Sequence, residues 1–178
     1  MKIGFDIMGG DYAPSEAIKG VQLYFQQETD TSVHLLLIGD AEAASPYLSL
    51  LEPYKERYTL VNAPEVIGMH EHPTKALKEK PNSSIAMGFG MLMAQKSDAF
   101  ISAGNTGALM ALSRFVLKTL PGIDRPAIAT ILPNVHGKAY MLDLGANVDC
   151  GPEHLLQFGI MGAMLVSALE HKENPSVG

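Results

Sequence analysis

The sequence predicts an α/β protein with a mostly parallel sheet. Short apolar runs, each the length of a buried strand, alternate with longer segments that have the apolar spacing of amphipathic helices. The apolar run 33–38 is typical of a parallel strand that helices cover on both faces. The composition agrees, because 47% of the 178 residues are hydrophobic and 18% are charged, which excludes a disordered chain.

The first third of the chain contains three predicted strands and two predicted helices. Ile18, Val21 and Phe25 fall on one stripe of a helix, and Pro14 suits the first turn of that helix. In chain order we expect a strand over 3–7, a helix over 17–27, a strand over 33–38, a helix over 41–51 and a strand over 58–61.

The remainder begins with a long polar excursion over 62–81, which prolines and a glycine interrupt and which holds one short helix over 75–80. We then expect a helix from Ser83 or Ser84 to about residue 95, a strand over 99–102, a helix over 106–120, strands over 127–132 and 140–144 with a turn at His136 and Gly137, and a helix over 153–169. Because Val177 follows Pro175 as the start of another strand, we expect residues 1–178 to be a single α/β domain that is an incomplete amino-terminal part of a longer enzyme.

Charge and cysteine content exclude several classes of protein. The net charge is −6, so no global basic field recruits nucleic acid. The single cysteine, Cys150, excludes an internal disulfide framework and favours a reducing, cytoplasmic compartment. No stretch reaches the 18 uninterrupted apolar residues of a membrane span.

The most informative junction is Ser102–Gly107 (SAGNTG), which follows a predicted strand and opens a predicted helix. Small residues let backbone N–H groups approach a ligand, and the amino end of a helix favours an anion. Asn105 and Thr106 add polar side chains beside Gly104 and Gly107. The junction therefore predicts a phosphate site, although a tight turn with a helix cap explains the same spacing.

A second junction, Asp6–Pro14 (DIMGGDYAP), has two carboxylates on either side of Gly9 and Gly10. These carboxylates suit the orientation of a nucleophile, the binding of a cation or the capping of a helix. The simpler interpretation is that Asp11 caps the helix and that the two glycines make the turn.

The third junction, Asp143–His154, also leaves a strand and enters a helix, and Gly145 and Gly151 bracket its polar residues. Ligands of open parallel sheets bind at the carboxyl ends of the strands. We therefore expect the three junctions to converge on one edge of one sheet.

Other groupings have simpler explanations than a catalytic one. Cys150 and His154 suit a nucleophilic pair, but a buried cysteine beside a helix start explains them better. His70, Glu71 and His72 suit the start of a metal site, but no further ligand follows at a spacing typical of such sites. We therefore expect a solvated loop and no metal. No nicotinamide fingerprint or Walker motif occurs, and we expect no cofactor.

Four stretches together resemble the bacterial phosphate acyltransferases of phospholipid synthesis, the PlsX family. They are residues 6–14 (DIMGGDYAP), 98–110 (DAFISAGNTGALM), 122–127 (GIDRPA) and 144–155 (LGANVDCGPEHL). The resemblance extends from Met1 to Gly178 with the motifs in the same order. The family continues beyond this point with a motif whose lysine is thought to act in catalysis, so the resemblance implies a portion truncated at the carboxyl end.

The resemblance implies a cytoplasmic acyltransferase that moves a fatty acyl group from acyl carrier protein to inorganic phosphate. The acyl phosphate then feeds a glycerol-3-phosphate acyltransferase of the membrane. The implied fold is a three-layer α/β/α sandwich similar to isocitrate and isopropylmalate dehydrogenases and to phosphotransacetylase. Family members are homodimers that associate with the membrane surface. Two other functions stay open: a phosphotransacetylase-like enzyme that uses acyl-coenzyme A, and a non-catalytic phosphate-binding module.

Phosphate is already an anionic nucleophile, so we expect a site of backbone amides and neutral side chains instead of a catalytic triad. Asp6, Asp11, Asn105 and Asn147 are the candidate catalytic residues. The phosphate-binding candidates are Ser102, Gly104, Asn105, Thr106, Gly107, Gly145 and Ala146, and the residues expected to order the first loop are Gly9, Gly10 and Pro14. Acidic carrier protein requires a local basic patch, for which the candidates are Lys75, Lys78 and Lys80, or Arg114, Lys118 and Arg125.

Overall fold

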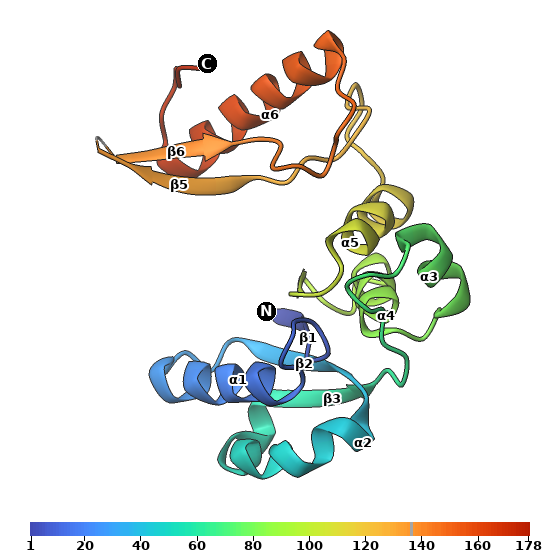
Figure 1. The fold of residues 1–178 in the computed structure, drawn as a ribbon. Coiled ribbons are helices and arrows are strands. Elements are labelled where there is room, and N and C mark those ends of the chain that lie inside the picture. The colour runs from blue at the N-terminus through green and yellow to red at the C-terminus, as the bar shows by residue number, and fades with distance from the viewer. Residues whose placement is uncertain (136) are drawn as a thin grey trace. The chain divides into compact units, whose positions relative to one another are not determined.

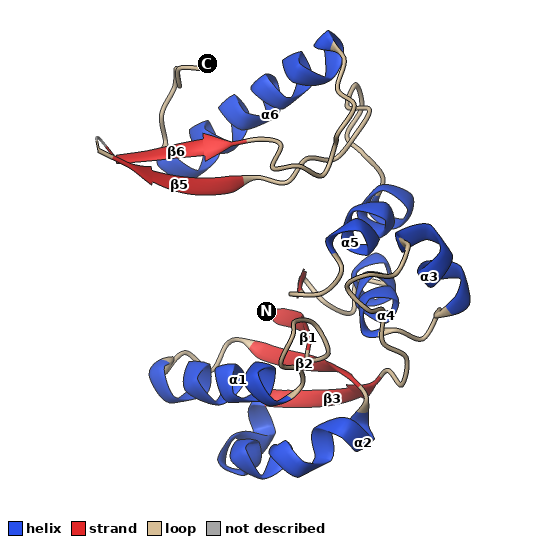
Figure 2. Ribbon diagram, in the orientation of Figure 1, coloured by secondary structure: helices blue, strands red, loops and turns tan. Residues whose placement is uncertain are grey.

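The computed structural model describes residues 1–135 and 137–178, which form two compact units, Met1–Leu117 and Lys118–Gly178. Each unit contains its own sheet and its own helices (Figures 1 and 2).

The first unit is built on a parallel sheet of four strands in the order β3-β2-β1-β4. The strands are β1 (Lys2–Asp6), β2 (His34–Gly39), β3 (Tyr58–Asn62) and β4 (Ala99–Ile101). Phe5 of β1 lies opposite Leu37 of β2 and Ile101 of β4. Because β1 and β4 are parallel neighbours, the loops that follow them leave the same edge of the sheet side by side.

Helices cover both faces of this sheet. Alternate residues of β2 point to opposite faces, and Leu35 and Leu37 join Ile18 and Phe25 in one buried cluster with helix α1 (Ser15–Gln27). Helix α4 (Ser84–Met93) contacts β1, β2 and β4, and it belongs to a second buried cluster with α3 (Pro73–Glu79) and α5 (Thr106–Leu112). The mixed α/β architecture expected from the sequence is confirmed.

Arg57 connects the end of α1 to the segment before β3. Its guanidinium donates hydrogen bonds to the carbonyl oxygens of Glu28 (3.0 Å) and Asp30 (2.9 Å) and lies 4.5 Å above the Phe25 ring. A planar cation that satisfies carbonyls at the carboxyl end of a helix stabilises that end.

Two helices differ from the prediction. The helix expected over 41–51 is an α-helix only over Ala41–Ala44 (α2) and continues as 3₁₀-type turns over Ser45–Arg57 (η1). Pro46 and Pro53 explain this, because each lacks the N–H that a continuous α-helix needs. The helix expected over 106–120 leaves the α conformation at Ser113–Leu117 (η2), where the turns are π-helical, and Lys118 has a positive φ of 66°.

The second unit pairs a hairpin with one long helix. Strands β5 (Thr130–Asn134) and β6 (Gly137–Met141) are antiparallel and form a sheet of their own, and α6 (Pro152–Glu170) follows. The two observed strands therefore lie closer together along the sequence than the expected strands 127–132 and 140–144. The short connection explains the antiparallel pairing, since parallel neighbours need a long crossover. Gly137 begins β6, whereas His136, expected in the turn, lies outside the described residues.

Helix α6 is 19 residues long. Throughout residues 1–135 and 137–178, however, no helix combines the length and the apolarity that crossing a bilayer requires.

Candidate active site

The first two junctions meet through a chain of hydrogen bonds that begins at Asp6. Asp6, at the end of β1, is 3% exposed, and one carboxylate oxygen accepts the backbone N–H of Met8 at 2.9 Å. The other oxygen accepts the Ser102 hydroxyl at 2.7 Å, and the same hydroxyl oxygen accepts the N–H of Gly104 at 3.0 Å. Asp6 therefore fixes both loops, one directly at Met8 and the other through Ser102. The Gly104 N–H already binds the Ser102 hydroxyl and is not free to bind a ligand.

Gly9 allows these two loops to touch. A Cβ atom at this position would lie 2.6 Å from the backbone nitrogen of Gly104 and 3.0 Å from that of Ala103. Gly10 has φ of +98°, a left-handed conformation that an L side chain disfavours. The two glycines are thus required by a close approach of backbone and by the turn itself.

Asn105 is buried, with 5% exposure, and its amide is fully used within the protein. The carbonyl oxygen caps α5 by accepting the N–H of Ala108 at 3.0 Å. The amide nitrogen donates to three backbone carbonyls, those of Gly68 (3.0 Å), Met69 (3.3 Å) and Glu71 (3.1 Å). The side chain therefore faces protein groups, and the capping interpretation of this junction is the one that its hydrogen bonds support.

Thr106, which is exposed, and Gly107, which is half-buried, are the first two residues of α5. Their N–H groups have no hydrogen-bond partner within the described residues, as is normal for the first turn of a helix. A Cβ on Gly107 would overlap the ring of Pro73, so this glycine lets α5 pack against α3.

A hollow of about 330 Å³ opens beside the two junctions, between the β1–α1 loop, the first turn of α1 and the end of β4. Asp11 lines it and is exposed, and no described residue binds its carboxylate. Asp11 does not cap α1, whose N-cap residue is Pro14. The residues that line the hollow are Phe5, Asp6, Gly9, Gly10, Asp11, Tyr12, Ala13, Glu16, Ala17, Ile101, Ser102 and Ala103.

The third junction lies in the second unit and is ordered around Asp143. Its carboxylate accepts the N–H of Ile128 (2.9 Å) and both the backbone (2.6 Å) and side-chain (3.0 Å) nitrogens of Asn147. Burial acts to raise the pKa of Asp143, but hydrogen bonds from Ile128, Asn147 and Leu144 outweigh it and hold the pKa below the ordinary value of 3.8. The Asn147 side chain also donates to the Pro126 carbonyl at 2.9 Å.

The other candidates of this junction have local roles. Gly145 has φ of +78° and makes the turn beside Ala146. The Cys150 thiol donates to the Asn147 carbonyl at 3.4 Å, whereas His154 Nδ1 accepts the Gly151 N–H at 3.1 Å. The strand before this junction, β6, belongs to the separate hairpin sheet, so the prediction that all three junctions leave one edge of one sheet is wrong.

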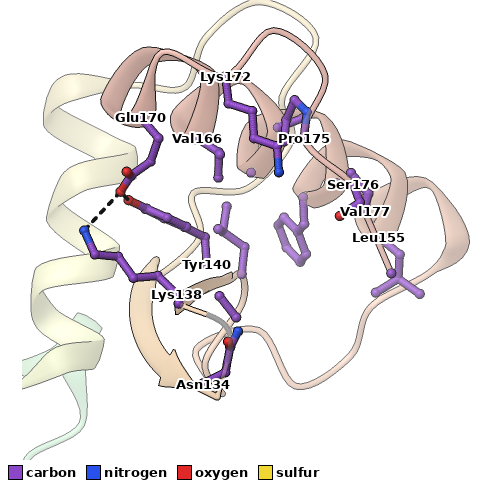
Figure 3. Close-up of a pocket in the computed structure, with 18 residues that line it drawn as sticks. Asn134, Lys138, Tyr140, Leu155, Val166, Glu170, Lys172, Pro175, Ser176 and Val177 are labelled. Atoms are coloured by element: carbon purple, nitrogen blue, oxygen red, sulfur yellow. Dashed lines mark hydrogen bonds and ion pairs between the residues drawn. The ribbon is translucent and has the colours of Figure 1, made fainter.

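A further hollow, of about 850 Å³, lies within the second unit between the hairpin, α6 and the last residues of the chain (Figure 3). Apolar side chains such as Phe158 and Val166 line its interior, and Lys138 forms an ion pair of 3.2 Å with Glu170 at one end. Tyr140 donates its hydroxyl to the same carboxylate. None of the predicted site residues lines this hollow.

The model of the fatty acid synthesis protein family matches residues 1–178. The chain belongs to this family. Among its curated relatives, a phosphate acyltransferase from Chromobacterium violaceum is 50% identical over 99% of this chain and 51% of that protein. Proteins of the same name from Herminiimonas arsenicoxydans and Methylococcus capsulatus are 48% and 45% identical over 100% and 99% of the chain. The chain spans about half the length of these relatives.

A solved structure has the same fold as this member of the fatty acid synthesis family. It is a phosphotransacetylase from Streptococcus pyogenes, with a TM-score of 0.67 and 18% sequence identity, covering 97% of this chain and 55% of that one.

For this family member, the sequence predicted the long loop that begins at residue 62 but not its contact with the candidate site. Residues 65–72, here named the strap, pass between β3 and α3 and bind Asn105. Glu71 of the strap forms a 2.5 Å ion pair with Lys80, which holds the pKa of Glu71 below its ordinary value of 4.5. No spacing rule identifies this pair, because its partners lie on either side of a helix.

Proposed function

We propose that the full-length protein transfers an acyl group from a thioester to inorganic phosphate and releases an acyl phosphate. The observation that carries this proposal is 45–50% identity, over essentially the whole chain, to proteins named phosphate acyltransferase. A glycine-rich junction beside a hollow at the carboxyl edge of a parallel sheet supports it, since ligands bind at that edge.

The reaction needs positioning more than it needs a strong base. A phosphate oxygen attacks the thioester carbonyl carbon, the carbon–sulfur bond breaks, and the thiolate leaves and takes up a proton. Orientation of the reactants supplies roughly 7–11 kcal/mol of the barrier, and one good oxyanion donor contributes about 3–4 kcal/mol. Free backbone N–H groups suit both tasks.

We assign phosphate to the junction Ser102–Gly107, with the N–H groups of Thr106 and Gly107 as its donors. They are preferred over Gly104, whose N–H already binds Ser102. Asp6 orders the Gly9–Gly10 loop through the Met8 N–H, whereas the exposed Asp11 carboxylate binds no described residue. Both carboxylates are proposed to stay away from phosphate, because like charges repel.

Gly145, Ala146 and Asn147 of the second unit are further proposed substrate-binding residues. The Asn147 side chain is committed to Asp143 and Pro126. The backbone of this segment is therefore the part proposed to face the substrates.

Acyl carrier protein is the proposed acyl donor. Among the basic candidates in the first unit, Lys80 binds Glu71 and Val66, and Lys75 lies 3.9 Å from Glu79. Lys78 and Arg114 are exposed, and no described residue pairs with either. They are consequently the preferred contacts for an acidic partner there, with Lys118 and Arg125 as the candidates in the second unit.

The remaining proposals concern the whole enzyme. It is proposed to adopt the isocitrate/isopropylmalate dehydrogenase-like sandwich, to act as a homodimer in the cytoplasm, and to associate with the membrane where a glycerol-3-phosphate acyltransferase consumes the acyl phosphate. No cofactor enters the proposed reaction.

The test is thiol release by the full-length protein from a fatty acyl thioester of acyl carrier protein, with and without phosphate. We expect release only with phosphate and accumulation of acyl phosphate. Equal release from acyl-coenzyme A would favour a phosphotransacetylase-like enzyme. Release that ignores phosphate, or none with either donor, would overturn the proposal in favour of a binding module.

A further inference from the structure

The strap is held by the protein at several points along its length. At its start, the Glu65 carboxylate accepts the N–H of Asn82 at 2.6 Å. In its middle, Ile67 is buried, with 5% exposure, and the Val66 carbonyl accepts the Lys80 ammonium at 2.7 Å. This loop is therefore fixed by specific contacts and not merely by the elements that flank it.

Lys80 and Glu71 close the strap on itself. Glu71 accepts both the Lys80 ammonium (2.5 Å) and the Gly68 N–H (2.7 Å) on one carboxylate oxygen. Since Lys80 also binds the Val66 carbonyl, one cation joins two points of the strap. Removing Lys80 would free this end of the loop without touching the β4–α5 junction.

Asn105 holds the strap from the other side. Among the described residues, it is the only member of the Ser102–Gly107 junction that hydrogen-bonds to the strap, and its amide nitrogen donates to three strap carbonyls. Its oxygen meanwhile caps Ala108. The orientation of the Asn105 amide, and with it the backbone that leads into Thr106 and Gly107, is fixed by these two sets of contacts.

We propose that Asn105 is a positioning residue that keeps the phosphate junction pre-ordered by clamping it to the strap, and that Lys80 supports the same clamp; this rests on the proposed function. Phosphate that binds an already ordered junction loses no free energy in ordering it. Releasing the strap adds this cost to binding and therefore weakens it. Interactions made equally in the bound substrate and in the transition state alter KM and leave kcat nearly unchanged.

The variants separate a clamp from a direct ligand. Asn105→Ser retains a hydroxyl acceptor that suits a helix cap but loses the donors to the strap. Lys80→Met frees the strap at a residue that lies outside the phosphate junction. In the full-length protein we expect Asn105→Ser to raise the phosphate KM roughly tenfold and Lys80→Met to raise it at least about threefold, with kcat changed less than about threefold in both.

The double variant provides the sharpest comparison. If both residues act through the strap, the second substitution adds little, and the phosphate KM of the double variant stays within about twofold of that of Asn105→Ser. Lys55→Met is the matched control, because Lys55 also forms an ion pair with a glutamate, Glu52, but lies on the exposed η1 segment away from the strap. Its phosphate KM is expected to equal that of the wild type.

Hydrogen–deuterium exchange gives a readout that does not depend on activity. We expect both single variants to speed exchange of the Gly68 and Glu71 amides, while Leu37 in β2 remains protected. A wild-type enzyme without phosphate-dependent thiol release would contradict the proposed function alone. Given an active wild type, unchanged phosphate KM in Lys80→Met, additive KM effects, or unchanged strap exchange would each overturn the clamp. Should Asn105→Ser fail to fold, Lys80→Met still decides the question.

Discussion

Gly9 is a residue at which the backbones of the two loops of the candidate site approach closely. Its missing Cβ would lie 2.6 Å from a backbone nitrogen, which cannot rotate away as a side chain does. Gly9→Ala is therefore expected to destabilise the protein by about 1–3 kcal/mol, as overpacking does in a tight site. Urea unfolding followed by circular dichroism measures this.

The control for Gly9→Ala is Gly20→Ala. Gly20 lies on α1, and a Cβ there meets nothing within 4 Å. Alanine in an open helical position stabilises by roughly 0.5–1 kcal/mol. The explanation fails if the two variants change stability by the same amount.

The ion pair between Glu71 and Lys80 makes part of the stability depend on pH. Hydrogen bonding and charge from Lys80 lower the pKa of Glu71 below 4.5, so its contribution is present above that value and is lost as the pH falls through the folded-state pKa. Glu71→Gln is expected to be less stable than the wild type at neutral pH, and this difference should shrink as the pH falls below 4.5 and through the folded-state pKa of Glu71. Urea unfolding over this range tests it, and a difference that does not change with pH would argue against the ion pair.

At the scale of elements, a glycine allows α4 to pack closely against the sheet. A Cβ on Gly88 would enter the ring of Phe100 on β4, whereas a Cβ on Gly90 meets nothing within 4 Å. We expect Gly88→Ala to lower the free energy of unfolding by about 1–3 kcal/mol and Gly90→Ala to leave it unchanged or raise it by up to about 1 kcal/mol. Since both substitutions lie on one helix, chemical denaturation of the pair separates packing from helix propensity. Equal effects would show that α4 does not approach β4 this closely.

At the scale of the molecule, the buried core is concentrated in the first unit. Phe158 is the one hydrophobic residue of the second unit that is buried among the described residues, and all the others belong to Met1–Leu117. On α6, Leu156, Ile160 and Met164 are 66%, 49% and 67% exposed, and their spacing of four places them on one stripe. The second unit therefore has little apolar burial with which to offset the entropy of ordering its chain.

This asymmetry predicts the behaviour of the two units when they are made separately. A fragment of residues 1–117 should unfold cooperatively in urea, because it keeps both buried clusters. A fragment of residues 118–178 should show no cooperative transition. Circular dichroism and amide exchange compare the two. A cooperative 118–178 fragment would mean that the hairpin and α6 suffice as a core.

The sequence by itself determined the four strands of the first unit and its helices α1, α3 and α4, because apolar periodicity and interruption by glycine and proline are local signals. It also determined which loops are glycine-rich, and its motifs predicted the family to which the chain belongs. It did not predict the 3₁₀ turns of Ser45–Arg57. The apolar pattern there favours an α-helix, but the two prolines prevent one in the folded chain.

Tertiary structure alone decided what the polar residues of those loops contact. The sequence singled out Asn105 as a ligand for phosphate, but folding brings three strap carbonyls, more than thirty residues away along the chain, to its amide. The pairing of Asp6 with Ser102 likewise depends on β1 and β4 being neighbours, although 96 residues separate the two side chains. Periodicity reports which face of an element is buried, whereas the partner of a buried polar group is set by which distant backbone the fold brings within hydrogen-bonding distance.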